Sequence, residues 1–156
     1  MSSSIQQSLQ TSNATYASTF TQGDLALPPS KKYLVLTCMD ARIDPAAAFG
    51  IGLGDAHVIR NAGASAEDSL RSIVISQQLL GTREIVLVKH TGCGMLTFTN
   101  ADAKGIVEKN LGEEAANELG GFDFLPFNEL SNSVSSLVLV TSTGIASVVF
   151  TSPNSH

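Results

Sequence analysis

The sequence predicts an α/β fold with a central, mainly parallel β-sheet that is flanked by helices and preceded by an N-terminal helical arm. Short apolar runs typical of buried strands occur at residues 33–38, 57–60 and 84–89. Segments with helix start and stop signals separate them, and this alternation implies right-handed crossovers between parallel strands. With 156 residues and 43% apolar side chains, the chain can form one core in one domain.

The beginning of the chain differs in composition from the rest. Residues 1–30 are rich in Ser, Thr and Gln and end in a Pro-Pro-Ser sequence. We therefore expect residues 1–30 to form an arm outside the core and residues 31–156 to form a single domain. Four apolar side chains of the arm can share one face of a helix that packs on a neighbouring molecule. These are Ile5, Leu9, Tyr16 and Phe20.

Two helices are predicted between the strands. Asp44 followed by Pro45 is a typical N-cap and first-turn pair, and Gly50 marks the end of that helix. Residues 65–68 (Ser-Ala-Glu-Asp) resemble a capping box with Asp in place of Glu. They predict the start of a second helix, which Gly81 closes.

The last third of the chain is less regular. Residues 100–119 predict a polar helical stretch that is broken at Gly112. From residue 131 onwards there is no Asp, Glu, Lys or Arg, and residues 137–140 and 145–150 are β-prone. The pattern leaves open whether these segments are two strands or a helix and a strand.

Composition excludes several classes of partner. A net charge of −5 and an isoelectric point of about 5.0 argue against nucleic acid or an anionic membrane as the partner. No run reaches the roughly 18 apolar residues of a membrane span, and the N-terminus lacks the basic and apolar regions of a signal peptide. We expect a cytoplasmic protein, with mitochondrial import as the less favoured alternative.

Two short motifs contain both cysteines of the chain. Cys38 ends the first strand and Asp40 and Arg42 follow it, and alternation along an extended chain places the three on one side. His90 and Cys93 follow the third strand, with glycines on both sides of Cys93. Since ligands of parallel sheets bind outside the carboxyl ends of the strands, the two motifs are expected to meet. Without an export signal, metal binding or catalysis is a better interpretation of the cysteines than a disulfide.

The residue types of these motifs suit a catalytic zinc site. Two thiolates and one imidazole are ligands that Zn²⁺ prefers, and three protein ligands leave a fourth position for water. The Asp40 carboxylate could occupy that position itself, or Arg42 could hold it away from the metal in a bidentate pair. We expect one Zn²⁺ per chain held by Cys38, His90 and Cys93, with Asp40 as a further ligand in a closed form. A thiol–imidazole nucleophile and a purely structural zinc closed by Asp40 are the alternatives.

Four stretches of the sequence closely resemble the β-class carbonic anhydrases, in particular their short microbial and fungal forms. The likeness extends over residues 31–134. The motifs are CMDARIDP at 38–45, GDAHVIRNAG at 54–63, RSIVISQQLLGTREI at 71–85 and HTGCGMLTF at 90–98. The chain departs from the family pattern after residue 127, where a tail without charged residues from residue 131 onwards replaces a charged helix and an edge strand.

The resemblance implies a function and a site. It implies Cys38, His90 and Cys93 as zinc ligands, Asp40 and Arg42 as a catalytic dyad, and carbon dioxide bound near the backbone around Gly63. It also implies a homodimer or a larger assembly built on the N-terminal arm. The expected reaction is reversible hydration of carbon dioxide to bicarbonate and a proton. Hydrolysis of carbonyl sulfide or carbon disulfide on the same scaffold, and a catalytically weak zinc-binding homologue, are the alternatives.

Overall fold

The structure is a computed structural model that describes residues 3–90, 92–124, 136–141 and 144–149. The α-helices are α1 (Ser4–Thr19), α2 (Pro45–Phe49), α3 (Leu70–Val74), α4 (Asn100–Leu111) and α5 (Glu113–Glu118). The strands are β1 (Tyr33–Cys38), β2 (Ala56–Asn61), β3 (Glu84–Val88), β4 (Ser136–Thr141) and β5 (Gly144–Val149). Two 3₁₀ helices, η1 (Ala62–Ala64) and η3 (Gly94–Leu96), and a π-helix, η2 (Ile75–Leu79), complete the described elements.

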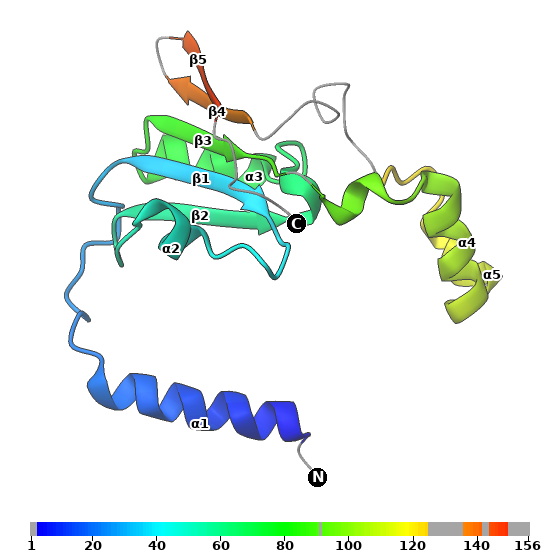
Figure 1. Cartoon of the computed structure of the whole chain (residues 1–156), viewed down its shortest axis with the longest axis horizontal. Helices are drawn as coiled ribbons and strands as arrows, with labels where there is room; N and C mark the ends of the chain where they lie inside the picture. Colours follow the sequence, from blue (N-terminus) through cyan, green and yellow to red (C-terminus); the bar gives the residue numbers. More distant parts are fainter. Residues whose placement is uncertain (1–2, 91, 125–135, 142–143, 150–156) are drawn as a thin grey trace.

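The strands form one sheet in the order β2-β1-β3-β4-β5 (Figure 1). Strands β2, β1 and β3 are parallel, which confirms the predicted α/β fold, and β4 and β5 add an antiparallel hairpin beside β3. The two β-prone segments of the tail are therefore both strands. The predicted end of the second one, Phe150, lies outside the described residues. Because the three parallel strands run in one direction, the segments that follow them leave the sheet at one edge.

Strand β1 lies at the centre of the core. Its residues Leu34, Val35, Leu36 and Thr37 are each at most 1% exposed. Helices α2 and α3 cover opposite faces of the parallel strands, which explains why β1 is a continuous apolar run (Figure 1). The core cluster comprises Leu34, Leu36, Ala64 and Ile73, with Ile59, Ile85 and Leu87 packed against it. The end of β1 is thus held firmly, and Cys38 is the residue at that end.

Helix α2 begins and ends where the sequence predicts. The Asp44 carboxylate accepts hydrogen bonds from the backbone N–H groups of Ala46 and Ala47, as an N-cap does. Gly50 ends the helix with φ of +62°, a conformation that glycine adopts without strain.

The second predicted helix differs from the expectation at its start. The Ser65 hydroxyl accepts a hydrogen bond from the Asp68 N–H, but the N–H of Ser65 donates to the Asn61 side chain. The reciprocal half of the capping box is therefore not formed, and residues 66–69 are a turn before α3 begins at Leu70. The helix then widens into η2 before Gly81 ends it with φ of +74°.

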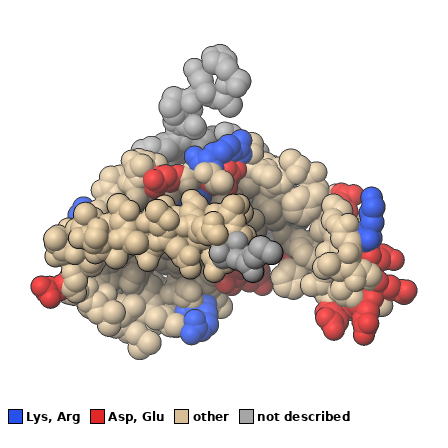
Figure 2. All heavy atoms as spheres, turned by 90° about the horizontal axis from the view of Figure 1, so that it is seen from below, with Lys and Arg blue, Asp and Glu red and all other residues tan. Residues whose placement is uncertain are grey.

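Two parts of the described chain stand away from the sheet. One is the hairpin of α4 and α5, which the break at Gly112 separates as predicted, and over which acidic side chains gather (Figures 1 and 2). The other is α1, which confirms the predicted helical arm but has no buried residue (Figure 1). Its apolar stripe is exposed to solvent in the single chain, at 70% for Ile5, 64% for Leu9, 56% for Tyr16 and 42% for Phe20. No helix in the described part of the chain is long and apolar enough to cross a bilayer.

Candidate metal centre

Three metal-binding side chains converge at the carboxyl edge of the parallel strands. Cys38 is the last residue of β1 and is 4% exposed, and His90 follows the neighbouring strand β3 by two positions. Cys93 is brought back toward them by a turn at Gly92, whose φ is +63°. One donor atom from each of the three residues lies within 4.8 Å of the others. The intervening Thr91 lies outside the described residues.

The spacing of the sulfurs suits a tetrahedral zinc ion. The Sγ atoms of Cys38 and Cys93 are 3.9 Å apart and both cysteines are free, so no disulfide joins them. Two sulfurs at about 2.3 Å from a tetrahedral Zn²⁺ lie roughly 3.8 Å apart. The donor set and its spacing therefore fit zinc, and three protein donors leave one coordination position open.

Asp40 and Arg42 form a bidentate ion pair beside this cluster. Arg42 donates from Nε to Asp40 Oδ1 at 2.9 Å and from a terminal nitrogen to Oδ2 at 2.6 Å. The same terminal nitrogen also donates to the Gly92 carbonyl at 3.0 Å, which joins the two sequence motifs. Asp40 Oδ2 lies 3.9 Å from Nε2 of His90, but Asp40 is not one of the three residues whose donor atoms cluster.

The pKa values of Asp40 and Cys93 are shifted in opposite directions. Hydrogen bonds from the Arg42 side chain and backbone hold the pKa of Asp40 well below its ordinary value. The carboxylate is therefore only an acceptor of hydrogen bonds at neutral pH. Burial raises the pKa of the Cys93 thiol; the backbone N–H of Met95 lowers it in part, and the neighbouring Cys38 raises it again. A bound cation favours the thiolate forms, because metal binding releases the thiol protons.

A cavity of about 290 Å³ opens beside the cluster. Its polar wall includes Cys38, Asp40 and Cys93, and its remaining wall includes the backbone of Gly63 and the apolar side chains of Met95 and Phe98. Such a cavity suits a small, weakly polar molecule placed against the donor cluster.

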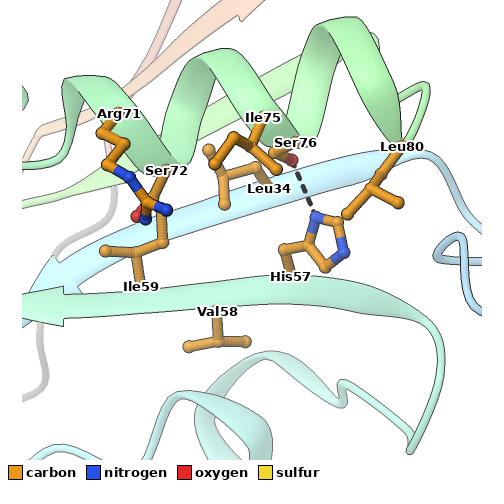
Figure 3. A pocket seen from close by; sticks show the side chains of 9 residues that line it. All are labelled: Leu34, His57, Val58, Ile59, Arg71, Ser72, Ile75, Ser76 and Leu80. Atoms are coloured by element: carbon orange, nitrogen blue, oxygen red, sulfur yellow. Dashed lines mark hydrogen bonds between the residues drawn. The ribbon is translucent and has the colours of Figure 1, made fainter.

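A second cavity of about 350 Å³ lies between α3, η2 and the strands β1 and β2 (Figure 3). His57 lies at one end of it and shares a hydrogen bond of 2.8 Å with Ser76, which in turn contacts Thr82 at 2.8 Å. His57 pairs in register with Leu34, four residues before Cys38, which is about 13 Å along a strand. His57 is thus a strand residue with an ordinary hydrogen bond, and it is distant from the metal donors.

Two basic residues that were not predicted also support the site. Arg60 donates to the backbone carbonyls of Cys38 at 3.2 Å and Asp40 at 2.8 Å. Lys89 donates from Nζ to the Gly63 carbonyl at 2.6 Å. The feature of the sequence that could have indicated their role is their position at the carboxyl ends of β2 and β3, where a charged residue interrupts an apolar run.

The fold and the site together define an α/β protein with a candidate metal-binding triad and an Asp–Arg pair at the carboxyl edge of its parallel strands. The protein-family model described as carbonic anhydrase matches residues 33–118. This match covers more than half of the chain, and the chain therefore belongs to the carbonic anhydrase family.

Individual relatives identify the β class within this family. Beta-carbonic anhydrase 1 of Mycobacterium tuberculosis is 54% identical over 101 residues, which are 64% of this chain and 61% of that protein. The structure of a carbonic anhydrase from Glaciozyma antarctica is similar with a TM-score of 0.71 and 47% identity, over 79% of this chain and 75% of that one. A carbon disulfide hydrolase of an Acidianus species is 41% identical over 87 residues, which are 54% of this chain and 43% of that protein.

Proposed function

We propose that the protein catalyses the reversible hydration of carbon dioxide to bicarbonate and a proton, with one Zn²⁺ held by Cys38, His90 and Cys93. The observation that supports this most directly is the convergence of the three donors beside an Asp–Arg pair and a small cavity. Membership of the carbonic anhydrase family supports the same reaction. The chain spans 61% of the length of the mycobacterial relative.

The residues of the site have different roles in this reaction. Zinc, when bound, supplies the acidification of a water molecule, whose pKa falls to near 7. Asp40 orients that water by accepting its hydrogen bond, since its carboxylate is ionised and faces the donor cluster. Arg42 engages both oxygens of Asp40 and so keeps this carboxylate from becoming a fourth ligand. The apolar walls at Met95 and Phe98 offer carbon dioxide a place without competing hydrogen bonds.

A stopped-flow assay of carbon dioxide hydration tests the proposal. We expect hydration well above the uncatalysed rate from the zinc-loaded protein, and much slower release of hydrogen sulfide from carbonyl sulfide or carbon disulfide. Hydrogen sulfide release without carbon dioxide hydration would instead assign the chain to the hydrolases that the Acidianus relative represents. Full zinc content with neither activity would identify a zinc-binding homologue that is not an efficient enzyme.

We also propose that the protein is a homodimer that uses α1 as its arm. The exposed stripe of Ile5, Leu9, Tyr16 and Phe20 gives the reason, because a helix without buried residues gains little by folding alone. Light scattering is expected to give about twice the chain mass of 16.3 kDa. Leu9→Glu should shift the protein toward monomer, whereas Ser8→Glu, with the same charge beside the stripe, should not. A monomeric zinc-loaded protein at micromolar concentration would refute the dimer.

A further inference from the structure

Lys89 connects two loops that flank the candidate metal centre. It lies between the end of β3 and His90, and its ammonium group donates a hydrogen bond of 2.6 Å to the carbonyl of Gly63 in η1. Strand β1 lies between β2 and β3 in the sheet. The side chain therefore reaches across the end of β1, where Cys38 is located, and joins the loop after β2 to the loop after β3.

The loop that Lys89 holds has an uncommon backbone conformation. Gly63 and Ala64 have φ values of +67° and +58°, so that two consecutive residues are left-handed. Alanine adopts this conformation at a cost in free energy, and such a conformation persists only where its surroundings enforce it. One side of the loop is fixed by Asn61, which bonds both the N–H and the carbonyl of Ser65 at 2.7 Å. The hydrogen bond from Lys89 fixes the Gly63 peptide, which also lines the cavity beside the cysteines.

Lys89 also places a positive charge near the donor cluster. The residue is partly buried, and burial lowers its pKa, whereas the charges of Cys93 and Cys38 raise it. The Gly63 carbonyl that accepts its hydrogen bond lines the same cavity as both cysteines, which places the ammonium group beside the wall of the site. Two thiolates neutralise the charge of Zn²⁺, so an anion at the open position would give the site a net negative charge. A fixed cation nearby stabilises that anion, the more so in a partly buried site.

We propose that Lys89 is a positioning residue of this site, which fixes the Gly63 wall of the cavity and favours a small anion such as bicarbonate at the metal. This inference rests on the proposed function for its natural anion. The hydrogen bond from Lys89 to Gly63 is independent of which reaction the site performs.

The test compares three variants with the wild-type protein. Lys89→Met removes the ammonium group at similar length, Lys89→Arg retains charge and donors, and Lys104→Met is the matched control. Lys104 donates a similar hydrogen bond to the carbonyl of Gly120 at 2.7 Å, but it lies on α4, away from the sheet. Each protein is loaded with Co²⁺ and titrated with thiocyanate, and the visible cobalt spectrum reports anion binding at the metal.

We expect the thiocyanate Kd to rise about tenfold in Lys89→Met, which corresponds to the loss of one charge-assisted interaction. Lys89→Arg should stay within about threefold of the wild type, and Lys104→Met should be unchanged. In the zinc enzymes, the KM for bicarbonate in the dehydration direction should rise in Lys89→Met more than kcat falls. If Lys89→Met does not fold, Lys89→Gln replaces it, since the amide retains a donor without the charge.

An unchanged thiocyanate Kd in a folded, metal-loaded Lys89→Met or Lys89→Gln protein would overturn the inference. An equal rise in Lys104→Met would do the same, because the effect would then not depend on the site. If the wild-type protein does not hydrate carbon dioxide, the proposed function fails. The cobalt titration still decides the role of Lys89 in that case, because it measures anion binding without turnover.

Discussion

Purified protein is expected to contain about one zinc ion per chain, and Cys38→Ser, His90→Ala and Cys93→Ser are each expected to lose it. In the proposed site, these three residues supply all the protein ligands, so each substitution leaves two. A serine hydroxyl is a much poorer ligand for Zn²⁺ than a thiolate, and a remaining pair does not hold the ion against dialysis. Carbon dioxide hydration should fall with the metal content, by roughly a thousandfold or more when the metal site is lost.

Metal analysis by mass spectrometry after dialysis against a mild chelator measures this loss. His57→Ala is the matched control for His90→Ala, because His57 is the histidine of the same sheet that bonds Ser76 and lies apart from the donors. It should retain zinc. A full zinc content in Cys93→Ser would show that Cys93 is not a zinc ligand, and the proposed set of three protein ligands would then be wrong.

The parts of the fold that could be predicted are those whose signals are contained in a few consecutive residues. The ends of α2 depend on Asp44, Pro45 and Gly50, and each of them acts on its own helix. Strand β1 is a run of apolar residues because both faces of the sheet are covered, and that burial is visible in the sequence itself.

The parts that could not be predicted depend on residues distant in the sequence. Ser65 fails to form a complete capping box because Asn61, at the end of β2, takes its N–H. The π-helix η2 has no sequence signature of its own; it accompanies the hydrogen bonds that Ser76 makes with His57 and Thr82.

The same distinction between local and distant signals applies to the candidate site. Its donors were identifiable because each motif lies at the carboxyl end of a strand, and parallel strands end at one edge of the sheet. The bond between Lys89 and Gly63 could not be predicted, because it depends on a backbone carbonyl. Every residue has a backbone carbonyl, so the sequence does not indicate which carbonyl accepts a hydrogen bond from Lys89.

Arg42→Ala is expected to keep its zinc and to lose most of its activity, by about a hundredfold or more. Zinc with two thiolates has no net charge, and a bound Asp40 carboxylate would fill the open position. In the structure the Arg42 guanidinium engages both oxygens of Asp40, at 2.9 and 2.6 Å, and so competes with the metal for this carboxylate. Without the guanidinium, Asp40 is free to close the site, and the water that the reaction needs is displaced.

Asp40→Ala should also keep zinc, since Cys38, His90 and Cys93 remain, but it loses the acceptor that orients the water. The two variants therefore have the same low activity for opposite reasons. The site is closed by Asp40 in Arg42→Ala, and it is open but lacks the hydrogen-bond acceptor in Asp40→Ala. Thiocyanate binding to the cobalt-substituted proteins separates these two cases, because Asp40→Ala should bind the anion and Arg42→Ala should not. Arg42→Lys serves as the control, since a lysine retains the charge but cannot engage both carboxylate oxygens in a planar fork, so it should recover only part of the rate. If Arg42→Ala hydrates carbon dioxide at close to the wild-type rate with its zinc in place, Arg42 does not control access to the metal.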